Sequence, residues 1–308
     1  MTGSRAPGAV VALDVGASQI KGALIAADGR RITQTRQDTG RAAGPDAVLA
    51  RVVAAAQELM AAPGPEVLAG GVAVCGTVDT SGLVTAVNLG WVRAAVSAEL
   101  SRRLRIPITV VNDAHAGAIG EGTSGSARDV RDYLYVSLGT GIGAAIVQDG
   151  RVAAGAHGHA GELGHIKLAG HGRLCACGER GCLETVMSAA ALESGWLERH
   201  GSALPAERII DLVIASDPAA ERLWLEAVEA LAMGLLTAIS LIDPATIVLG
   251  GGLAAAGSRL IDPLLHSMRA RARSFHVIDG LRLASLGAWS GCIGAGAAAW
   301  QLPAAVAS

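Results

Sequence analysis

The chain has 308 residues, of which 51% are hydrophobic and 17% charged, and its net charge at pH 7 is −2. This composition excludes an intrinsically disordered protein, and the length allows two modest domains, each with its own core. The weak net charge, without a lysine or arginine stripe, gives no electrostatic basis for nucleic-acid binding. The longest apolar helical run, residues 231–242, is too short to cross a bilayer, and no secretion signal is evident. We therefore expect a cytoplasmic protein without a membrane partner.

Hydrophobic periodicity predicts alternating strands and helices along the whole chain. In the first half, strands are predicted at residues 10–16, 20–27, 31–39, 70–74 and 107–111, and helices at 45–62, 94–103 and 114–121. In the second half, strands are predicted at 133–138, 144–148, 246–249 and 281–286, and helices at 188–199, 208–215, 219–241, 260–272 and 290–300.

The two halves begin with similar sequences. D-V-G-A-S-Q-I-K-G-A-L-I-A-A-D-G-R from Asp14 and S-L-G-T-G-I-G-A-A-I-V-Q-D-G-R from Ser137 both read as strand, glycine turn and strand, and both end in D-G-R. This is a weak internal repeat at the scale of a domain. No linker or low-complexity stretch separates the halves, so we expect two similar domains that pack around a cleft.

Three glycine-rich turns follow predicted strands, at residues 14–18, 139–143 and 250–252. Glycine allows backbone N–H groups to approach phosphate oxygens closely, although a tight hairpin would explain any one of these turns without a ligand. The P-loop and dinucleotide-binding fingerprints are both absent. Three such turns in two repeated halves suggest a nucleotide clamped between domains, with Asp14 beside the metal that accompanies the phosphates.

Asn112 and Asp113 follow a predicted strand and open a predicted helix. One of them is expected to cap the helix. Asp113 would also lie at the carboxyl end of a strand, where ligands of α/β sheets bind. A carboxylate there could take the proton of a substrate hydroxyl as it attacks a phosphoryl group.

Cysteine spacing indicates a metal site. Cys175, Cys177 and Cys182 lie within eight positions, and His165 and His171 precede them. Three thiolates and one imidazole complete the tetrahedral shell of a structural zinc ion. Disulfides are disfavoured in a cytoplasmic chain, an iron–sulfur cluster usually needs four cysteines, and a redox pair reads C-x-x-C rather than C-x-C. Spacing does not choose between the two histidines.

Two carboxylates, Glu162 and Glu184, are interleaved with these ligands. A polar loop that is pinned by a metal and carries acids at both ends would make a rigid pocket for a hydroxyl-rich ligand.

Seven motifs together carry a family resemblance. They are D-V-G-A-S-Q-I-K at Asp14, V-N-L-G-W at Val87, V-N-D-A-H-A-G-A-I-G-E at Val111, L-G-T-G-I-G at Leu138, G-A-H-G-H-A-G-E-L-G-H at Gly155, C-A-C-G-E-R-G-C-L-E at Cys175 and I-V-L-G-G-G-L at Ile247. Through nearly its whole length the chain resembles the ROK family (repressors, open reading frames and kinases), and within it the zinc-containing bacterial glucokinases. The cysteine block with its upstream E-L-G-H is the most specific of these motifs.

The resemblance implies an α/β protein with a duplicated actin-like, hexokinase-like (ribonuclease H-like) ATPase fold and two domains around a cleft. The domains would be a small one at residues 1–112, to which a C-terminal helix at 291–308 returns, and a large one at 113–290 with the zinc site. The implied cofactors are ATP, Mg²⁺ and structural Zn²⁺. The implied reaction is phosphorylation of a hexose at its 6-hydroxyl, with glucose expected first. N-acetylmannosamine, N-acetylglucosamine, allose and fructose are alternative substrates.

The resemblance also implies roles for individual residues. Asp113 would be the catalytic base, and His165, Cys175, Cys177 and Cys182 the zinc ligands. The sugar ligands would be Asn112, Asp113, Glu162, His165 and Glu184, with Gly76 and Asn88 near the pocket. The nucleotide side would comprise Asp14, Gly16, Ser18, Lys21, Gly139, Thr140, Gly141 and Gly251.

The chain departs from the family pattern in the first phosphate turn. Gly16-Ala17-Ser18 stands where most relatives have G-G-T, and Cys75 stands where a proline is common. Ala17 would be strained if the backbone there needed a positive φ, so a slow enzyme or a sugar sensor is an alternative to an active kinase. A DNA-binding regulator is disfavoured because the first strand begins by Val10, leaving no room for a winged helix-turn-helix. Relatives suggest a homodimer or homotetramer.

Overall fold

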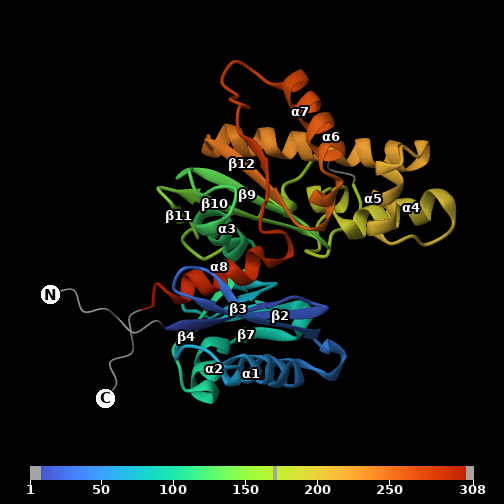
Figure 1. Cartoon of the computed structure of the whole chain (residues 1–308). Helices are drawn as coiled ribbons and strands as arrows, with labels where there is room; N and C mark the ends of the chain where they lie inside the picture. Colours follow the sequence, from blue (N-terminus) through green and yellow to red (C-terminus); the bar gives the residue numbers. More distant parts are fainter. Residues whose placement is uncertain (1–7, 169–171, 303–308) are drawn as a thin grey trace. The chain divides into compact units, whose positions relative to one another are not determined.

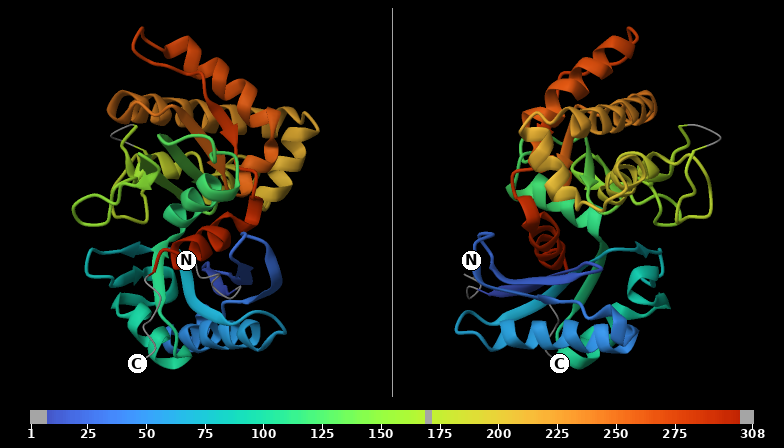
Figure 2. Two further views of the ribbon diagram at one scale, coloured as in Figure 1. Left: turned by 60° about the vertical axis from the view of Figure 1, so that its left-hand side comes forward. Right: turned by 90° about the vertical axis from the view of Figure 1, so that its right-hand side faces the viewer.

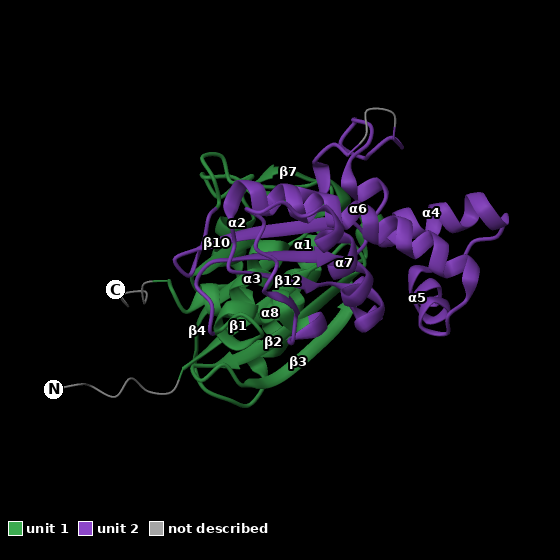
Figure 3. Cartoon of the chain, turned by 90° about the horizontal axis from the view of Figure 1, so that it is seen from above, with its two compact units in different colours: residues 1–128, 154–160, 289–308 green, residues 129–153, 161–288 purple. Residues whose placement is uncertain are grey.

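The structure is a computed structural model that describes residues 8–168 and 172–302 (Figure 1). The chain divides into two compact units, coloured separately in Figure 3. Unit 1 comprises residues 1–128, 154–160 and 289–308, and unit 2 comprises residues 129–153 and 161–288. The domain boundary expected after residue 112 stays a prediction.

Unit 1 is built on a mixed five-stranded sheet. Its strands are β1 (Ala9–Val15), β2 (Gln19–Ala26), β3 (Arg31–Asp38), β4 (Val67–Val74) and β8 (Ile108–Asn112). The order is β3-β2-β1-β4-β8. β1, β2 and β3 are joined as antiparallel neighbours, whereas β4 runs parallel to both β1 and β8.

Within its described residues, unit 1 also contains four α-helices, a small antiparallel sheet and short 3₁₀ helices. The helices are α1 (Pro45–Ala61), α2 (Val96–Leu104), α3 (Asp113–Ser124) and α8 (Ser290–Ala299). The small sheet contains β5 (Thr77–Val78), β6 (Val84–Ala86) and β7 (Trp91–Ala94) in that order. The sequence did not predict these three strands, because runs of two to four residues are too short to show a period.

The central strand β1 is buried on both faces, so its residues are apolar almost throughout. Val11 and Leu13 belong to a core cluster that includes residues of α1 and α2. Val10 and Ala12 belong to a second cluster with Cys292 of α8. Figure 2 shows α1 and α8 on opposite faces of this sheet.

Close packing of α8 depends on residues without large side chains. A Cβ built on Gly71 of β4 would lie 1.8 Å from the carbonyl oxygen of Ala295, and one built on Gly294 would lie 1.7 Å from the carbonyl oxygen of Ala116 in α3. The backbone of α8 therefore approaches both the sheet and α3 at distances that only glycine permits at these positions. This explains why α8 reads G-C-I-G-A-G-A-A-A after Ser290.

Unit 2 repeats the architecture of the first sheet. Its strands are β9 (Tyr133–Leu138), β10 (Ile142–Gln148), β11 (Arg151–Val152), β12 (Thr246–Gly250) and β13 (Leu281–Leu283). The order is β11-β10-β9-β12-β13, with antiparallel pairing on one side of β9 and parallel pairing on the other. The predicted internal repeat is therefore confirmed, since the first strand of each sheet is central and its partners follow in the same order.

The helices of unit 2 are α4 (Ala189–His200), α5 (Ala206–Ile214), α6 (Pro218–Ile242) and α7 (Ser258–Arg271). Residues of all four contribute to one large core cluster with the sheet. α6 is longer than the apolar run singled out in the sequence, and by length and composition alone it would suffice to cross a membrane. However, 56% of its most apolar window is buried inside the protein, as in the core helix of a globular domain.

The packing of α8 generates a stability prediction. Gly294→Ala should lower the free energy of unfolding by about 1–3 kcal/mol, because the new methyl group has no room beside Ala116. Gly252→Ala is the matched control, since a Cβ at Gly252 would have no heavy atom within 4 Å. Urea unfolding of both variants measures the difference. Equal stabilities would show that α8 can shift at no cost.

Candidate functional site

Asn112 and Asp113 lie where β8 ends and α3 begins. The side-chain oxygen of Asn112 accepts the N–H of His115 at 3.0 Å and caps the helix, as was expected of one of the two residues. Its amide nitrogen donates to the carbonyl oxygen of Gly76 at 2.9 Å. Asp113 is the first residue of α3 and is half-buried. The helix N-terminus favours an ionised carboxylate at this position.

The Cys75 thiol lies near Asp113. Burial, and after it the negative charge of Asp113, raises the pKa of Cys75 to about 12. The Cys75 thiol is therefore protonated at neutral pH. The backbone N–H of Cys75 donates to the carbonyl oxygen of Val15 at 3.3 Å, a bond that a proline at this position could not make.

Asp14 lies at the end of β1 and pairs with Lys21 of β2, whose Nζ is 3.3 Å from the carboxylate. Burial raises the pKa of Asp14 above its usual value, and Lys21 opposes that rise. A Cβ built on Gly291, in the first turn of α8, would lie 3.2 Å from the carboxylate. Asp14 thus faces the N-terminus of α8, where a negative charge is favoured.

The first glycine turn is held by a residue that the sequence analysis missed. Thr39 is completely buried; its hydroxyl donates to the carbonyl oxygen of Gly16 at 2.7 Å and its N–H to that of Ser18 at 2.9 Å. A threonine at a strand end carries no motif, so sequence gave no signal for it. Ala17 is not among the residues with a positive φ, so the strain considered for this position does not arise.

The second glycine turn joins β9 to β10 through Gly139, Thr140 and Gly141. The carbonyl oxygen of Gly139 accepts the N–H of Ala189 at 2.8 Å, at the start of α4. Gly251, after β12, has a φ of +84°, and a Cβ there would lie 2.4 Å from the carbonyl oxygen of Leu138. Its position therefore requires glycine, both for backbone conformation and for space.

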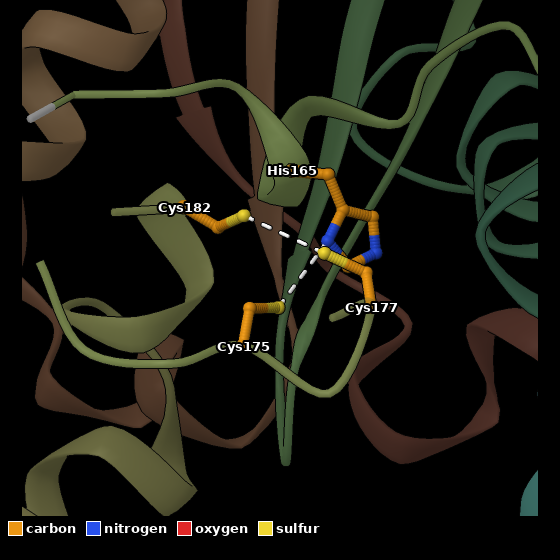
Figure 4. A group of neighbouring side chains, drawn as sticks. All are labelled: His165, Cys175, Cys177 and Cys182. Carbon is orange, nitrogen blue, oxygen red and sulfur yellow. Dashed lines mark hydrogen bonds between the residues drawn. The ribbon is translucent and has the colours of Figure 1, made fainter. Parts of the chain in front are cut away.

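Three cysteines and one histidine of unit 2 converge in a cluster (Figure 4). The ligand atoms of His165, Cys175, Cys177 and Cys182 all lie within 4.8 Å of one another. His165 Nδ1 is 3.6 Å from Cys175 Sγ, and Cys177 Sγ is 3.7 Å from Cys182 Sγ. His171, the other histidine considered, lies outside the described residues.

This donor set fits a tetrahedral zinc ion. Zinc–sulfur bonds of about 2.3 Å place tetrahedral ligand atoms roughly 3.8 Å apart, close to the two separations in the cluster. Burial raises the pKa of Cys175 to about 12, so a thiolate there needs a cation. The four residues could therefore hold a structural zinc, which would fix the loop without supplying a vacant coordination position.

The carboxylates beside the cluster lie on its ligand-bearing loop. His165 directs Nδ1 to the cluster, while its Nε2 is 3.8 Å from a carboxylate oxygen of the exposed Glu162. Glu184 is half-buried; its Oε2 accepts the N–H of Ile142 at 3.0 Å and its Oε1 is 3.6 Å from Cys175 Sγ. His165 can thus coordinate a metal through one nitrogen and meet a ligand through the other.

Both sheets have the same strand order, and polar residues lie at the ends of their central strands. This arrangement defines the class as a duplicated α/β protein of the actin-like, hexokinase-like type. The ROK family model matches residues 10–302. The chain belongs to the ROK family. Asn88, the remaining residue expected near the pocket, is exposed in the 3₁₀ helix Val87–Leu89 of unit 1.

Named kinases are among the proteins similar to this chain. A glucokinase of Halalkalibacterium halodurans is 34% identical over 236 residues, which cover 71% of each chain. An N-acetyl-D-glucosamine kinase of Mannheimia succiniciproducens is 35% identical over 166 residues, 50% of this chain and 55% of the relative. The structure of a ROK family glucokinase from Streptomyces griseus in complex with glucose and AMPPNP has a TM-score of 0.87 at 27% identity, covering 96% of this chain and 100% of that one.

The cluster geometry predicts about one zinc per chain. Cys182→Ser should abolish zinc retention and lower the thermal unfolding temperature, because Cys182 is a fully buried member of the donor set. Cys75→Ser should keep the zinc, since Cys75 lies outside the cluster. Metal content after dialysis measures both. A wild-type chain without zinc, or a Cys182 variant that retains it, would contradict the site.

The Asp14–Lys21 pair predicts a pH-dependent stability loss. A raised pKa makes the folded state bind the Asp14 proton more tightly than the unfolded state, so this contribution favours folding at low pH and is lost as pH rises through the folded pKa. Lys21→Met removes the group that lowers this pKa. The variant should lose about 1–3 kcal/mol at pH 7, and less at pH 4.

Urea unfolding at the two pH values measures this difference. Arg30→Ala is the control, because the Arg30–Asp28 pair is largely exposed and should contribute little at either pH. An equal loss at pH 4 and pH 7 would show that Lys21 stabilises the fold by packing and not by compensating Asp14.

Proposed function

We propose that this protein is an ATP-dependent sugar kinase that phosphorylates a hexose at its 6-hydroxyl, with glucose as the expected substrate. The observation that carries the proposal is a half-buried carboxylate, Asp113, at the N-terminus of α3 directly after β8. The similarity to glucokinases, one of them in complex with glucose and AMPPNP, supports the reaction class.

In the proposed mechanism Asp113 accepts the proton of the sugar 6-hydroxyl as its oxygen attacks the γ-phosphorus. The bond from the γ-phosphorus to the β–γ bridging oxygen breaks, ADP leaves, and the sugar 6-phosphate keeps the transferred phosphoryl group. The anchoring of Asn112 to both His115 and Gly76 supports a fixed direction for the adjoining Asp113.

We assign the binding of sugar hydroxyls to Asn112, Glu162, His165 and Glu184 as well as Asp113. A carboxylate accepts hydrogen bonds from sugar hydroxyls, and an imidazole fixed by a metal loses little freedom on binding. Zinc would hold the loop that carries three of these side chains. We expect Gly76 and Asn88, which are uncharged, to lie near the bound sugar.

The nucleotide is assigned to the glycine turns. Asp14, Gly16, Ser18 and Lys21 would lie near the phosphates, and Gly139, Thr140, Gly141 and Gly251 would contact the nucleotide. We expect Asp14 to lie beside the Mg²⁺ ion that accompanies the phosphates. The ion, when bound, would neutralise charge that develops on the phosphates.

Two substrate readings are supported by the relatives. Similarity to the glucokinases supports glucose as the substrate. Similarity to the N-acetyl-D-glucosamine kinase, 35% identical over a shorter stretch, supports an N-acetylhexosamine. Both readings use the same base and differ in the walls of the sugar pocket. A catalytically silent sugar sensor is the remaining alternative.

A coupled ADP-release assay across hexoses and N-acetylhexosamines tests the proposal. Wild type should turn over at least one of these sugars, and Asp113→Asn should lower kcat on it by about 10²–10⁴-fold, because the amide cannot accept the proton. Calorimetry should show that Asp113→Asn still binds the sugar. Full activity in the variant would exclude Asp113 as the base. Tight sugar binding by a wild type without turnover would favour the sensor.

A further inference from the structure

We propose that Glu184 is a positioning residue for the nucleotide turn, in addition to its assigned contact with the sugar. The inference rests on the proposed kinase function, in which the turn at Gly139, Thr140 and Gly141 contacts the nucleotide. It concerns a role within unit 2, where one carboxylate joins the thiol cluster to that turn.

The first observation is the direct bond between Glu184 and the end of the turn. Glu184 Oε2 accepts the backbone N–H of Ile142 at 3.0 Å, across 42 residues of sequence. A Cβ built on Gly141 would lie 2.2 Å from the same oxygen. Gly141 does not have a positive φ, so its backbone conformation alone does not demand glycine. A side chain at residue 141 would therefore displace the Glu184 carboxylate from its place beside the turn.

The second observation is that backbone N–H groups at the start of α4 hold the turn from its other side. The carbonyl oxygen of Gly139 accepts the N–H of Ala189 at 2.8 Å, and that of Thr140 accepts the N–H of Ala190 at 3.5 Å. In a trans peptide the carbonyl and the following N–H point in opposite directions. The N–H groups of Thr140 and Gly141 are therefore directed away from α4, as two successive amides suited to an anion.

The third observation is that these anchors share one short segment. Cys182 belongs to the thiol cluster, Glu184 bonds the turn, and Ser188 caps α4 by accepting the N–H of Ala191 at 3.1 Å. Glu184 Oε1 lies 3.6 Å from Cys175 Sγ. The position of the turn is thus set by the loop that carries the cluster, so the sugar side and the nucleotide side of unit 2 depend on one carboxylate.

Two substitutions at Glu184 separate its two roles. Glu184→Ala removes both, and should weaken binding of Mg–AMPPNP about tenfold in the absence of sugar, because the Ile142 N–H loses its acceptor. Glu184→Gln keeps a carbonyl oxygen for that N–H, and should bind Mg–AMPPNP within about threefold of wild type. Both variants should bind glucose more weakly, since both lose the negative charge.

Glu162→Ala is the matched control. Glu162 is also a carboxylate assigned to the sugar and lies on the same loop, but it contacts His165, whereas Glu184 contacts the turn. This variant should bind glucose more weakly and Mg–AMPPNP as wild type does. Calorimetric titrations of each ligand alone give both affinities, and zinc content verifies that each variant keeps its loop.

The outcomes are distinguishable. Unchanged Mg–AMPPNP affinity in Glu184→Ala, or the same loss in Glu162→Ala, would overturn the positioning role. If Glu184→Ala does not fold, Glu184→Asp replaces it: the carboxylate, shortened by one methylene, withdraws from the Ile142 N–H, so Mg–AMPPNP binding should weaken, and wild-type affinity there would overturn the role. A wild type that binds Mg–AMPPNP but phosphorylates no sugar would refute the proposed function and leave the positioning result standing.

Discussion

The convergence of three thiols and an imidazole is the constraint that orders the loop of the proposed site in unit 2. Between Glu162 and Ser188 the described chain contains only two short 3₁₀ helices and two isolated β-bridges. Ordering the backbone of such a segment costs about 1–2 kcal/mol per residue, and the segment has little regular hydrogen bonding to offset this. A coordinated metal can supply about 10–16 kcal/mol of binding energy to a small site. With a metal bound, the cluster would therefore add substantially to the order that the packing of Leu163, Leu183 and Met187 gives to the loop that carries His165 and Glu184.

Duplication of the sheet explains why two glycine turns occupy equivalent positions. Each follows the central strand of its sheet and leads into an antiparallel partner, β1 into β2 and β9 into β10. The supports of the two turns have diverged. The first is held by the buried hydroxyl of Thr39, the second by the Glu184 carboxylate and the first amides of α4. A shared backbone path is thus stabilised by unrelated side chains, and the side chain that bonds the second turn comes from the loop that carries the thiol cluster.

The sequence predicted those helices and strands whose signal lies within a single continuous stretch of residues. Long apolar periods located the strands of both sheets except β11, and all the major helices, to within a few residues, and the repeat located the two turns. The strands β5, β6, β7 and β11 were missed because they are too short to show a period, and β13 ends three residues earlier than predicted. Spacing grouped the cysteines, but the bond from Glu184 to Ile142 and the support from Thr39 join residues far apart in sequence. Only the folded chain brings them together.

The departures from the family pattern in unit 1 carry less weight once their conformations are known. Alanine in place of glycine is costly where φ is positive, and Ala17 is not in that region. Cys75 in place of proline adds a backbone donor, which the carbonyl oxygen of Val15 accepts. Burial and the charge of Asp113 keep the thiol protonated at neutral pH, so Cys75 adds no second negative charge beside the proposed base. Backbone strain therefore gives no reason to expect a weakened phosphate turn. Only measurements of sugar binding and turnover can favour a sugar sensor over a kinase.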